Sequence, residues 1–237
     1  MRYALASLVL TTLLAACGSP SNDEAMFPLE QGRSWSYRTV TTLGDVGTAP
    51  SRESLTLTVR GSDAIEGAPA WRRRSSSGVE YWLRSDATGI FRVASKGPLD
   101  RDPLIDATPR YVLRKPFVVG TQWQANTTSY VLQRRNEYPR ELRHLTRYKT
   151  LPMSYRIDAV DERVVTPAGE FKDCLRVLGQ AEIRLYVDEA FAWRDVPLIT
   201  REWYCPGVGL ARLERNEPSP TKFILGGTVT MELTAWR

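Results

Sequence analysis

The sequence is poor in the residues on which common catalytic and metal sites depend. It has one histidine, His144, among 237 residues, and only three cysteines. A single histidine excludes a multi-histidine metal site, and any histidine-based triad would have to use His144. No nucleophile motif and no glycine-rich phosphate loop accompanies it. We therefore expect His144 to be a solvated loop residue, and we predict a non-enzymatic protein without a metal or other cofactor.

Long apolar runs and helical periodicity are also scarce. No stretch of 12 or more residues has a convincing helical period, although Glu137–Tyr148 is compatible with a short helix. The apolar run Tyr3–Ala16 would reach only about 21 Å as a helix, against roughly 30 Å for a bilayer core. A membrane-spanning helix is therefore not expected.

That apolar run has the layout of a secretory signal, because Arg2 precedes it and small residues follow it. The sequence Leu14-Ala15-Ala16-Cys17 resembles the bacterial lipobox, in which the cysteine thiol is diacylglycerylated and the chain is cut just before it. The alternative is an ordinary signal peptide cut after Gly18, since a cut after Ala16 would put bulky Leu14 where the ordinary peptidase prefers a small residue. The resemblance implies a lipoprotein signal peptide at 1–16 and a fatty-acylated (palmitate-type) Cys17.

Two or three acyl chains make a durable membrane anchor. In the lipobox family, Gly18 rather than Asp after the cysteine implies sorting to the outer membrane. Residues 17–26 are mostly small and polar, which is typical of a flexible tether. We expect a β-rich domain at 27–237, held in the cell envelope by its lipid anchor and facing the periplasm.

The charge is modest. Without residues 1–16 the chain keeps 31 basic residues (32 less Arg2) against 27 acidic ones, a net charge of +4. This balance does not imply a nucleic-acid partner. The basic segment 134–149 has a local net charge of +4 and would be attracted to anionic lipid, but a solvated loop is the favoured interpretation.

Two cysteines remain once Cys17 is acylated. Cys174 and Cys205 lie in strand-like segments, and the periplasm permits a disulfide. The alternative is two buried, unpaired thiols that behave as small apolar side chains.

Seven Trp, ten Tyr and six Phe favour strands. Leu55, Leu57 and Val59 alternate with polar residues, as a half-buried strand requires. Other expected strands are 34–37, 70–75, 79–84, 90–95, 128–134, 154–159, 164–166, 171–178, 182–187, 198–204, 208–214 and 228–236. The proline-rich stretch 97–110 is expected to be a connector, and Pro167–Gly169 a hairpin turn. The pattern predicts an all-β, antiparallel meander that forms a curved sheet or a partly closed barrel.

Two motifs recur in the same order. Pro28–Trp35 and Pro116–Trp123 share the pattern Pro, apolar, two residues, Gly, two residues, Trp. Trp82 with Gly89-Ile90 is matched by Trp203 with Gly209-Leu210. These echoes are compatible with two related halves, 27–96 and 115–237, or with a common way of starting a strand.

Three groups of residues resemble a family of uncharacterised bacterial lipoproteins. They are Phe27-Pro28-Leu29 with Gly32, Trp35 and Tyr37; Thr166-Pro167-Ala168-Gly169 with Phe171 and Cys174-Leu175-Arg176-Val177; and Trp203-Tyr204-Cys205-Pro206-Gly207-Val208-Gly209-Leu210. These domains are similar in outline to lipoprotein carriers of the LolA and LolB type, which implies an apolar groove. Cys205 stands where the family has a small residue, which favours the disulfide.

Four other clusters of charged residues are candidate sites. The aspartates 100, 102 and 106 lack the glycine and the closing glutamate of a calcium loop. The pairs Asp161-Glu162 and Asp188-Glu189 point to opposite faces of a strand and share no acid–base site. Of Arg72-Arg73-Arg74, one must face away from the other two, with snorkelling at a sheet edge as the simplest explanation.

The tryptophans are expected to fill the core, unless several line one concave surface and hold an apolar ligand. These features favour a non-enzymatic interaction or scaffold module. The alternative is a carrier that binds lipid or another apolar ligand in a β-groove.

Overall fold

The computed structural model describes residues 26–44, 47–134, 150–186, 192–218 and 224–237, where all regular structure is β-strand. The strands are β1 Ser34–Leu43, β2 Ser51–Ile65, β3 Ala68–Ser75, β4 Glu80–Asp86, β5 Gly89–Lys96, β6 Leu104–Arg114, β7 Gln122–Thr127, β8 Gln133–Arg134, β9 Leu151–Thr166, β10 Gly169–Tyr186, β11 Trp193–Cys205, β12 Gly209–Glu217, β13 Ile224–Leu225 and β14 Gly227–Trp236. Within these ranges no helix has the length and apolarity to cross a membrane.

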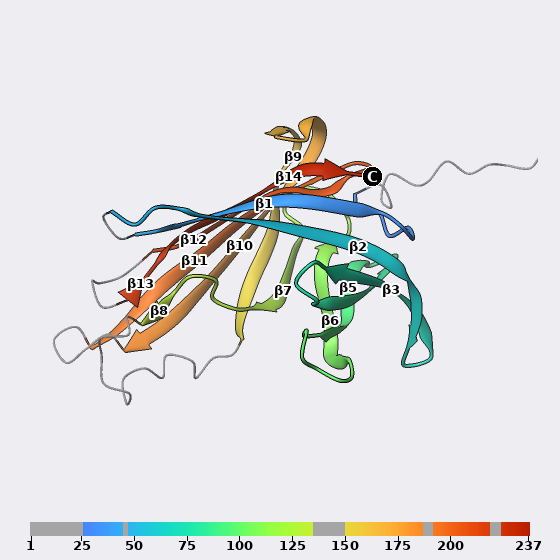
Figure 1. The fold of residues 1–237 in the computed structure, drawn as a ribbon, viewed down its shortest axis with the longest axis horizontal. Helices are drawn as coiled ribbons and strands as arrows, with labels where there is room; N and C mark the ends of the chain where they lie inside the picture. Colours follow the sequence, from blue (N-terminus) through green and yellow to red (C-terminus); the bar gives the residue numbers. More distant parts are fainter. Residues whose placement is uncertain (1–25, 45–46, 135–149, 187–191, 219–223) are drawn as a thin grey trace, which may run out of the picture.

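Twelve strands form one antiparallel sheet in the order β6-β5-β4-β3-β2-β1-β14-β12-β11-β10-β9-β7, and β8 pairs with β13 separately (Figure 1). The sheet consists of two six-stranded meanders, joined where β1 pairs with β14. Its outer strands β6 and β7 follow each other in the chain, and Arg110 Nε on β6 donates to Asn126 O on β7 at 2.8 Å. The sheet is therefore nearly closed into a barrel, which confirms the predicted all-β meander.

Several of the predicted strands alternate between buried and exposed side chains. Trp35 and Tyr37 are both buried, as are Val229 and Leu233 on β14. On β9, Met153, Tyr155 and Ile157 are buried and the residues between them are exposed. Alternation predicts these positions because successive side chains of a strand point to opposite faces.

The predicted connector 97–110 is wrong in its second part, because β6 begins at Leu104. Pairing with β5 skips residues 106–109, so Pro109 falls in a bulge on an outer strand. A proline can occupy a bulge because no neighbouring strand needs a hydrogen bond from the N–H that proline lacks.

The predicted strand 128–134 is displaced. Residues 122–127 form β7, on which Trp123, Ala125 and Thr127 are buried, and only Gln133–Arg134 of the predicted stretch is strand. The segment 128–132 instead turns backbone N–H groups toward the buried carboxylate of Glu217. A tertiary contact has therefore overridden the local pattern.

The predicted turn at Pro167–Gly169 is confirmed, but the strands beside it are longer than expected. The described parts of the predicted strands 171–178 and 182–187, up to Tyr186, belong to one continuous strand, β10, which does not break at Gly179. A Cβ added to Gly179 would lie 2.5 Å from Thr200 Cγ2, so the glycine allows a close approach rather than a turn.

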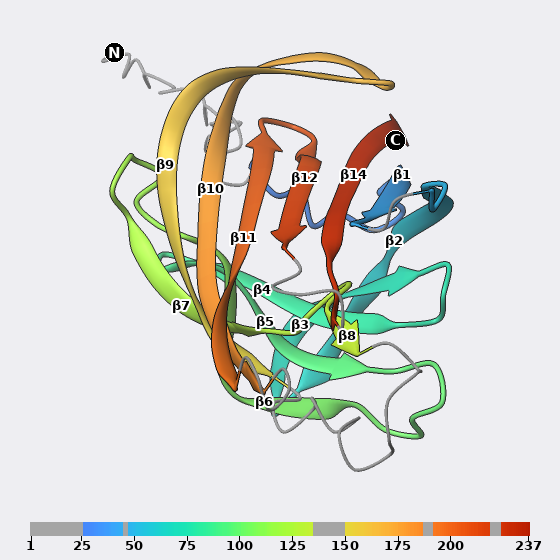
Figure 2. The same cartoon turned by 90° about the vertical axis from the view of Figure 1, so that its left-hand side faces the viewer.

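The β9–β10 hairpin bends where Asp161 and Asp173 have positive φ values of 57° and 56°. Its tip arches over β11, β12 and β14 (Figure 2). There Ala168 N donates to Leu233 O at 3.1 Å.

The buried apolar residues divide into three clusters. The largest draws on both meanders, from Leu83 and Leu113 to Trp123 and Leu198. The second contains Trp35 and Tyr37 together with residues of the hairpin tip, and the third surrounds Trp82 in the first meander.

The two sequence echoes fall on matching strands. Trp35 and Trp123 lie on β1 and β7, the first strand of each meander. Trp82 and Trp203 lie on β4 and β11, the fourth strand of each. The duplication stays a prediction that this correspondence supports, with the first meander reaching Arg114 rather than residue 96.

Candidate functional site

Arg73 occupies an unusual position for a charged residue. On β3 it is only 9% exposed, whereas Arg72 and Arg74 point to the other face and approach Asp63 and Glu80 at 3.4 and 3.7 Å. One arginine therefore faces away from the other two, as predicted. The predicted sheet edge is wrong, because β3 pairs with β2 on one side and β4 on the other. Arg73 consequently points into the protein rather than toward solvent.

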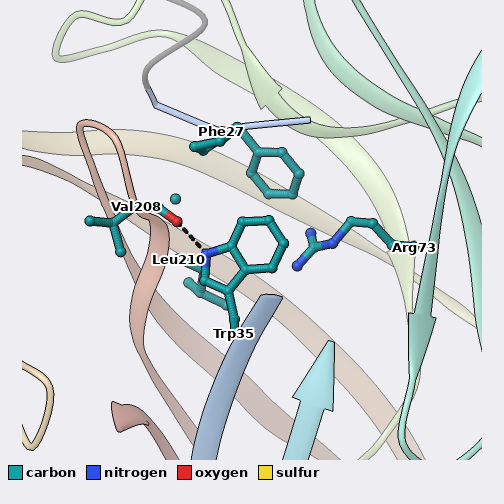
Figure 3. Close-up of a pocket in the computed structure, with 7 residues that line it drawn as sticks. Phe27, Trp35, Arg73, Val208 and Leu210 are labelled. Carbon is teal, nitrogen blue, oxygen red and sulfur yellow. Dashed lines mark hydrogen bonds between the residues drawn. The ribbon is translucent and has the colours of Figure 1, made fainter. Parts of the chain in front are cut away.

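Two aromatic rings hold the Arg73 guanidinium (Figure 3). Its central carbon lies 4.9 Å from the centroid of the Phe27 ring and 4.7 Å from that of Trp35. Cation–π contacts of this kind contribute about 0.5–2 kcal/mol each, more when water is excluded. The wall around the guanidinium is apolar and is completed by Pro28, Val208 and Leu210.

No acidic side chain accompanies Arg73 in this pocket, which we call the Arg73 pocket. Among the described residues its Nε–H has no acceptor, and no ion pair includes it. Burial lowers the pKa of Arg73, while the phenols of Tyr37, Tyr204 and Tyr81 act in the opposite direction. The pocket therefore holds one positive charge that its own side chains do not neutralise.

The other walls are fixed by hydrogen bonds. Trp35 Nε1 donates to Val208 O at 2.6 Å, and the Tyr37 hydroxyl donates to Leu210 O at 2.8 Å. Burial raises the pKa of Tyr37 to about 12, against a smaller opposing effect of Arg73. Gly209 adopts a φ of +85°, so a residue with a side chain would be strained there. These bonds join β1 to the β11–β12 turn.

A disulfide secures the same turn. Cys174 and Cys205 are bonded across neighbouring strands β10 and β11, with Cα atoms 4.2 Å apart, and both are fully buried or nearly so. Val208 N donates to Cys205 O at 3.1 Å. The bridge thus fixes the strand end from which Val208 and Gly209 reach the Arg73 pocket.

Glu202 is a second titratable group of interest, and it is half-buried. It accepts a 2.6 Å hydrogen bond from the Tyr204 hydroxyl. Burial raises the pKa of Glu202, and the Tyr204 bond, Arg110 and Arg215 oppose this only in part. Tyr204 in turn lies 6.2 Å from Phe27, ring centroid to centroid. A polar, phenol-rich stretch therefore continues inward from the Arg73 pocket.

A third group, the buried pair Arg215 and Glu217, is held by hydrogen bonds within the protein. Arg215 and Glu217 are 2% and 0% exposed, and Arg215 Nε donates to Glu217 Oε1 at 2.8 Å. The Glu217 carboxylate also accepts hydrogen bonds from the backbone N–H groups of residues 130, 131 and 132 and from the Ser129 hydroxyl. Burial acts to raise the pKa of Glu217, but these N–H donors and Arg215 outweigh it and lower the pKa. This pair fixes the segment after β7.

The sequence did not single out Arg215, Glu217, Glu202 or a buried role for Arg73. A usable signal existed for the first two. The alternation that buries Ala211 and Leu213 continues directly to residues 215 and 217 on the same face. For Arg73 the burial depends on Phe27, which lies far away in the sequence, and no local pattern announces it.

Three carboxylates of the acidic clusters, Asp100, Asp106 and Glu162, have structural partners. Asp106 forms a two-bond pair with Arg92 at 2.6 and 2.7 Å, and Asp100 accepts from Gly97 N. Glu162 accepts from Arg176 Nη1 and Trp203 Nε1. Across the described ranges no group of three or more His, Cys, Asp and Glu side chains is placed to hold a metal ion.

Other predicted residues lie outside the described ranges: Cys17, His144, Asp188, Glu189 and the segments 1–16 and 135–149. The described tryptophans do not share one surface. Trp35, Trp82 and Trp123 belong to three different clusters, and Trp193 and Trp236 are exposed. Trp35, Trp82 and Trp123 thus pack the core in separate places, which is the ordinary use of aromatic residues.

Comparison with solved structures gives two matches of low similarity. A candidate lipoprotein from Parabacteroides distasonis aligns with a TM-score of 0.40 and 13% identity, over 90% of this chain and 98% of that one. A candidate exported protein with a YmcC-like fold from Bacteroides fragilis aligns with a TM-score of 0.37 and 13% identity, over 89% and 98%. No protein-family model and no curated protein matches the sequence.

Proposed function

We propose that this protein is a lipid-anchored lipoprotein of the bacterial cell envelope, attached through Cys17. Its β-built body faces the periplasm from the outer membrane and acts as a non-enzymatic interaction or scaffold module. The membrane is its first partner, reached through the lipid anchor.

The observation that carries the proposal is the buried Cys174–Cys205 disulfide, in a chain whose N-terminal residues resemble a secretory signal and a lipobox. Disulfides persist in oxidising compartments such as the periplasm and are rare in the cytosol. The N-terminal residues would send the chain to the compartment in which the bridge is stable. Two features far apart in the sequence therefore agree on one location.

The distribution of polar groups supports a non-catalytic role. Buried Glu217 and half-buried Asp158 are bonded to arginines on their own or a neighbouring strand. Such pairs fix the fold and leave no free nucleophile or base beside them.

Acyl labelling of Cys17→Ser tests the anchor. In the native host, the wild-type chain should incorporate labelled palmitate and sediment with outer membranes, whereas the C17S chain should do neither. Labelling of Ser19→Ala should equal that of wild type, as a control close to the cut. Membrane-bound, labelled C17S protein would contradict the proposal.

A carrier remains the second candidate function, because the sheet curls around an apolar interior that contains Trp123 stacked on Tyr155 at 5.6 Å. Native mass spectrometry of the Cys17→Ser chain separates the two. Co-purifying lipid would favour the carrier, and its repeated absence would favour the scaffold.

A further inference from the structure

We propose that the Arg73 pocket is a binding site for a carboxylate that carries a small apolar group, and that Phe27 is its movable cover. The site is defined by three side chains: the Arg73 guanidinium, the Trp35 ring and the Phe27 ring. The proposal does not depend on lipidation of Cys17.

The charge of the pocket calls for an anion. Arg73 is more than nine-tenths buried, its Nε–H lacks an acceptor among the described residues, and the ionisable groups that act on it are all phenols. A buried charge is costly unless it is paired and hydrogen-bonded. Cation–π contacts with two rings offset part of that cost but leave the Nε–H without an acceptor among the described residues. An anion would supply both the opposite charge and the acceptor.

The shape of the guanidinium favours a carboxylate. Its Nε–H and one Nη–H point the same way, and a planar carboxylate accepts both in parallel. A phosphate dianion would leave one negative charge unpaired against the apolar walls of Pro28, Val208 and Leu210. The same walls suit a short apolar group attached to the carboxylate, because they bury it away from water.

Phe27 is the wall that can move. In the structure the two rings leave no room for a water-sized molecule beside Arg73. Trp35 lies on β1, which is paired on both sides, and its Nε1–H is bonded to Val208. In contrast, no hydrogen bond among the described residues holds the backbone of residues 26–29. Displacing Phe27 therefore disturbs apolar packing, including that on Arg73 and Tyr204, but no hydrogen bond among the described residues, whereas displacing Trp35 would break a strand.

The test follows the Arg73 Nε–H resonance by NMR in the full-length chain, labelled with ¹⁵N-arginine and held in an uncharged maltoside detergent. Butyrate is the probe, and butyramide is its neutral match of nearly equal shape. We expect butyrate to shift this resonance in a saturable way at constant ionic strength. Butyramide and sodium chloride should leave it in place.

Two variants give the matched comparison. Arg73→Gln should abolish the saturable response, read from Trp fluorescence. Arg74→Gln, on the exposed face of the same strand, should bind butyrate as wild type does. Phe27→Ala should bind at least about tenfold more tightly, because apparent affinity rises with the fraction of molecules in which the pocket is open.

Unfolding midpoints show whether each variant is folded, and the comparison of butyrate with butyramide on the wild type needs no variant at all. The proposal is overturned if wild type and Phe27→Ala both fail to respond to butyrate, or if Arg73→Gln binds it as well as wild type does.

A tripeptide with a free C-terminus, compared with its amidated form, identifies the source of the carboxylate. Tighter binding of the free peptide than of butyrate assigns the site to a peptide end. Tighter binding of butyrate assigns it to a free small carboxylate.

Discussion

Two buried arginines, one in each meander, are treated in opposite ways. Arg215 on β12 is 2% exposed and reaches Glu217, Thr128 O and Met153 Sδ. Arg73 on β3 is 9% exposed, and among the described residues its guanidinium has no partner besides the faces of two rings. Burial alone therefore does not show whether a charge serves the fold or a ligand. What distinguishes the two cases is whether the N–H donors of the arginine have acceptors within the protein.

The difference comes from the residues two positions away on the same strand face. For Arg215 that position holds Glu217, whose carboxylate also collects the N–H groups after β7. For Arg73 the corresponding positions hold Trp71 and Ser75, neither of which is acidic. One arginine carries its counter-charge on its own strand, and the other does not.

Breaking the Arg215 pair should have the largest effect. Glu217→Ala leaves a buried guanidinium and several backbone N–H groups without an acceptor, so we expect a loss of about 3–5 kcal/mol in the free energy of unfolding. Urea denaturation measures it. Glu170→Ala, which removes the exposed partner of Arg163, is the control and should cost less than about 1 kcal/mol. Equal losses in the two variants would show that the Glu217 cluster is not structural.

Removing the disulfide should cause the second-largest loss of stability, and it should act near the Arg73 pocket. The bridge closes a loop with a sequence separation of 31 residues, for which chain-entropy arguments give about 3.5 kcal/mol. We expect Cys174→Ala with Cys205→Ala to lower the free energy of unfolding by roughly that amount. Hydrogen exchange should quicken at Val208 N–H more than at residues 130–132. Uniform acceleration would mean that the bridge stabilises the whole sheet equally.

Arg73→Met should cost far less than the Glu217 variant. It forfeits two cation–π contacts but also removes an unpaired buried charge, and the two effects oppose each other. We expect a change in the free energy of unfolding within about 2 kcal/mol of zero, measured in the same urea series. Arg215→Met, which leaves Glu217 without its cation, should cost more. A loss from Arg73→Met as large as that from Arg215→Met would place Arg73 among the structural charges.

The smallest effect concerns Glu202, and it depends on pH. Because its pKa is raised in the folded state, the ionised carboxylate costs stability at neutral pH. That cost disappears as the pH falls through the folded pKa toward the unfolded value of about 4.3. Glu202→Gln keeps an acceptor for the Tyr204 hydroxyl, so it should raise the thermal midpoint at pH 7. The difference from wild type should vanish near pH 4. A midpoint difference that persists unchanged at pH 4 would contradict this account.

The alternating pattern predicted most of the strands and the all-β class, because the two-residue period of a strand can be read locally. The alternation over Leu55, Leu57 and Val59 predicts a half-buried strand, and Val59 is buried. Strand β6 was missed because Pro109 was taken as a break, although a bulge on an outer strand accommodates it. Residues 128–132 were misread because their N–H groups bind Glu217, 85 residues or more away in sequence.

The Arg73 pocket illustrates the same limit. The triple arginine predicts that one side chain faces away from its neighbours, and this is confirmed. The depth of its burial depends on Phe27 and Val208, from segments 46 and 135 residues distant. A local sequence pattern does not indicate that segments so far apart in the chain lie together.

The sequence by itself determined the strand character of the chain, the alternation of its faces and the predicted signal and lipidation site, since each depends on residues that are close neighbours. Tertiary structure decided what surrounds each buried arginine beyond its own strand, because it brings Thr128 and Met153 to Arg215 and the rings of Phe27 and Trp35 to Arg73. Such contacts act over a few ångströms in space, and between segments far apart in the chain only the closure of the sheet sets those distances.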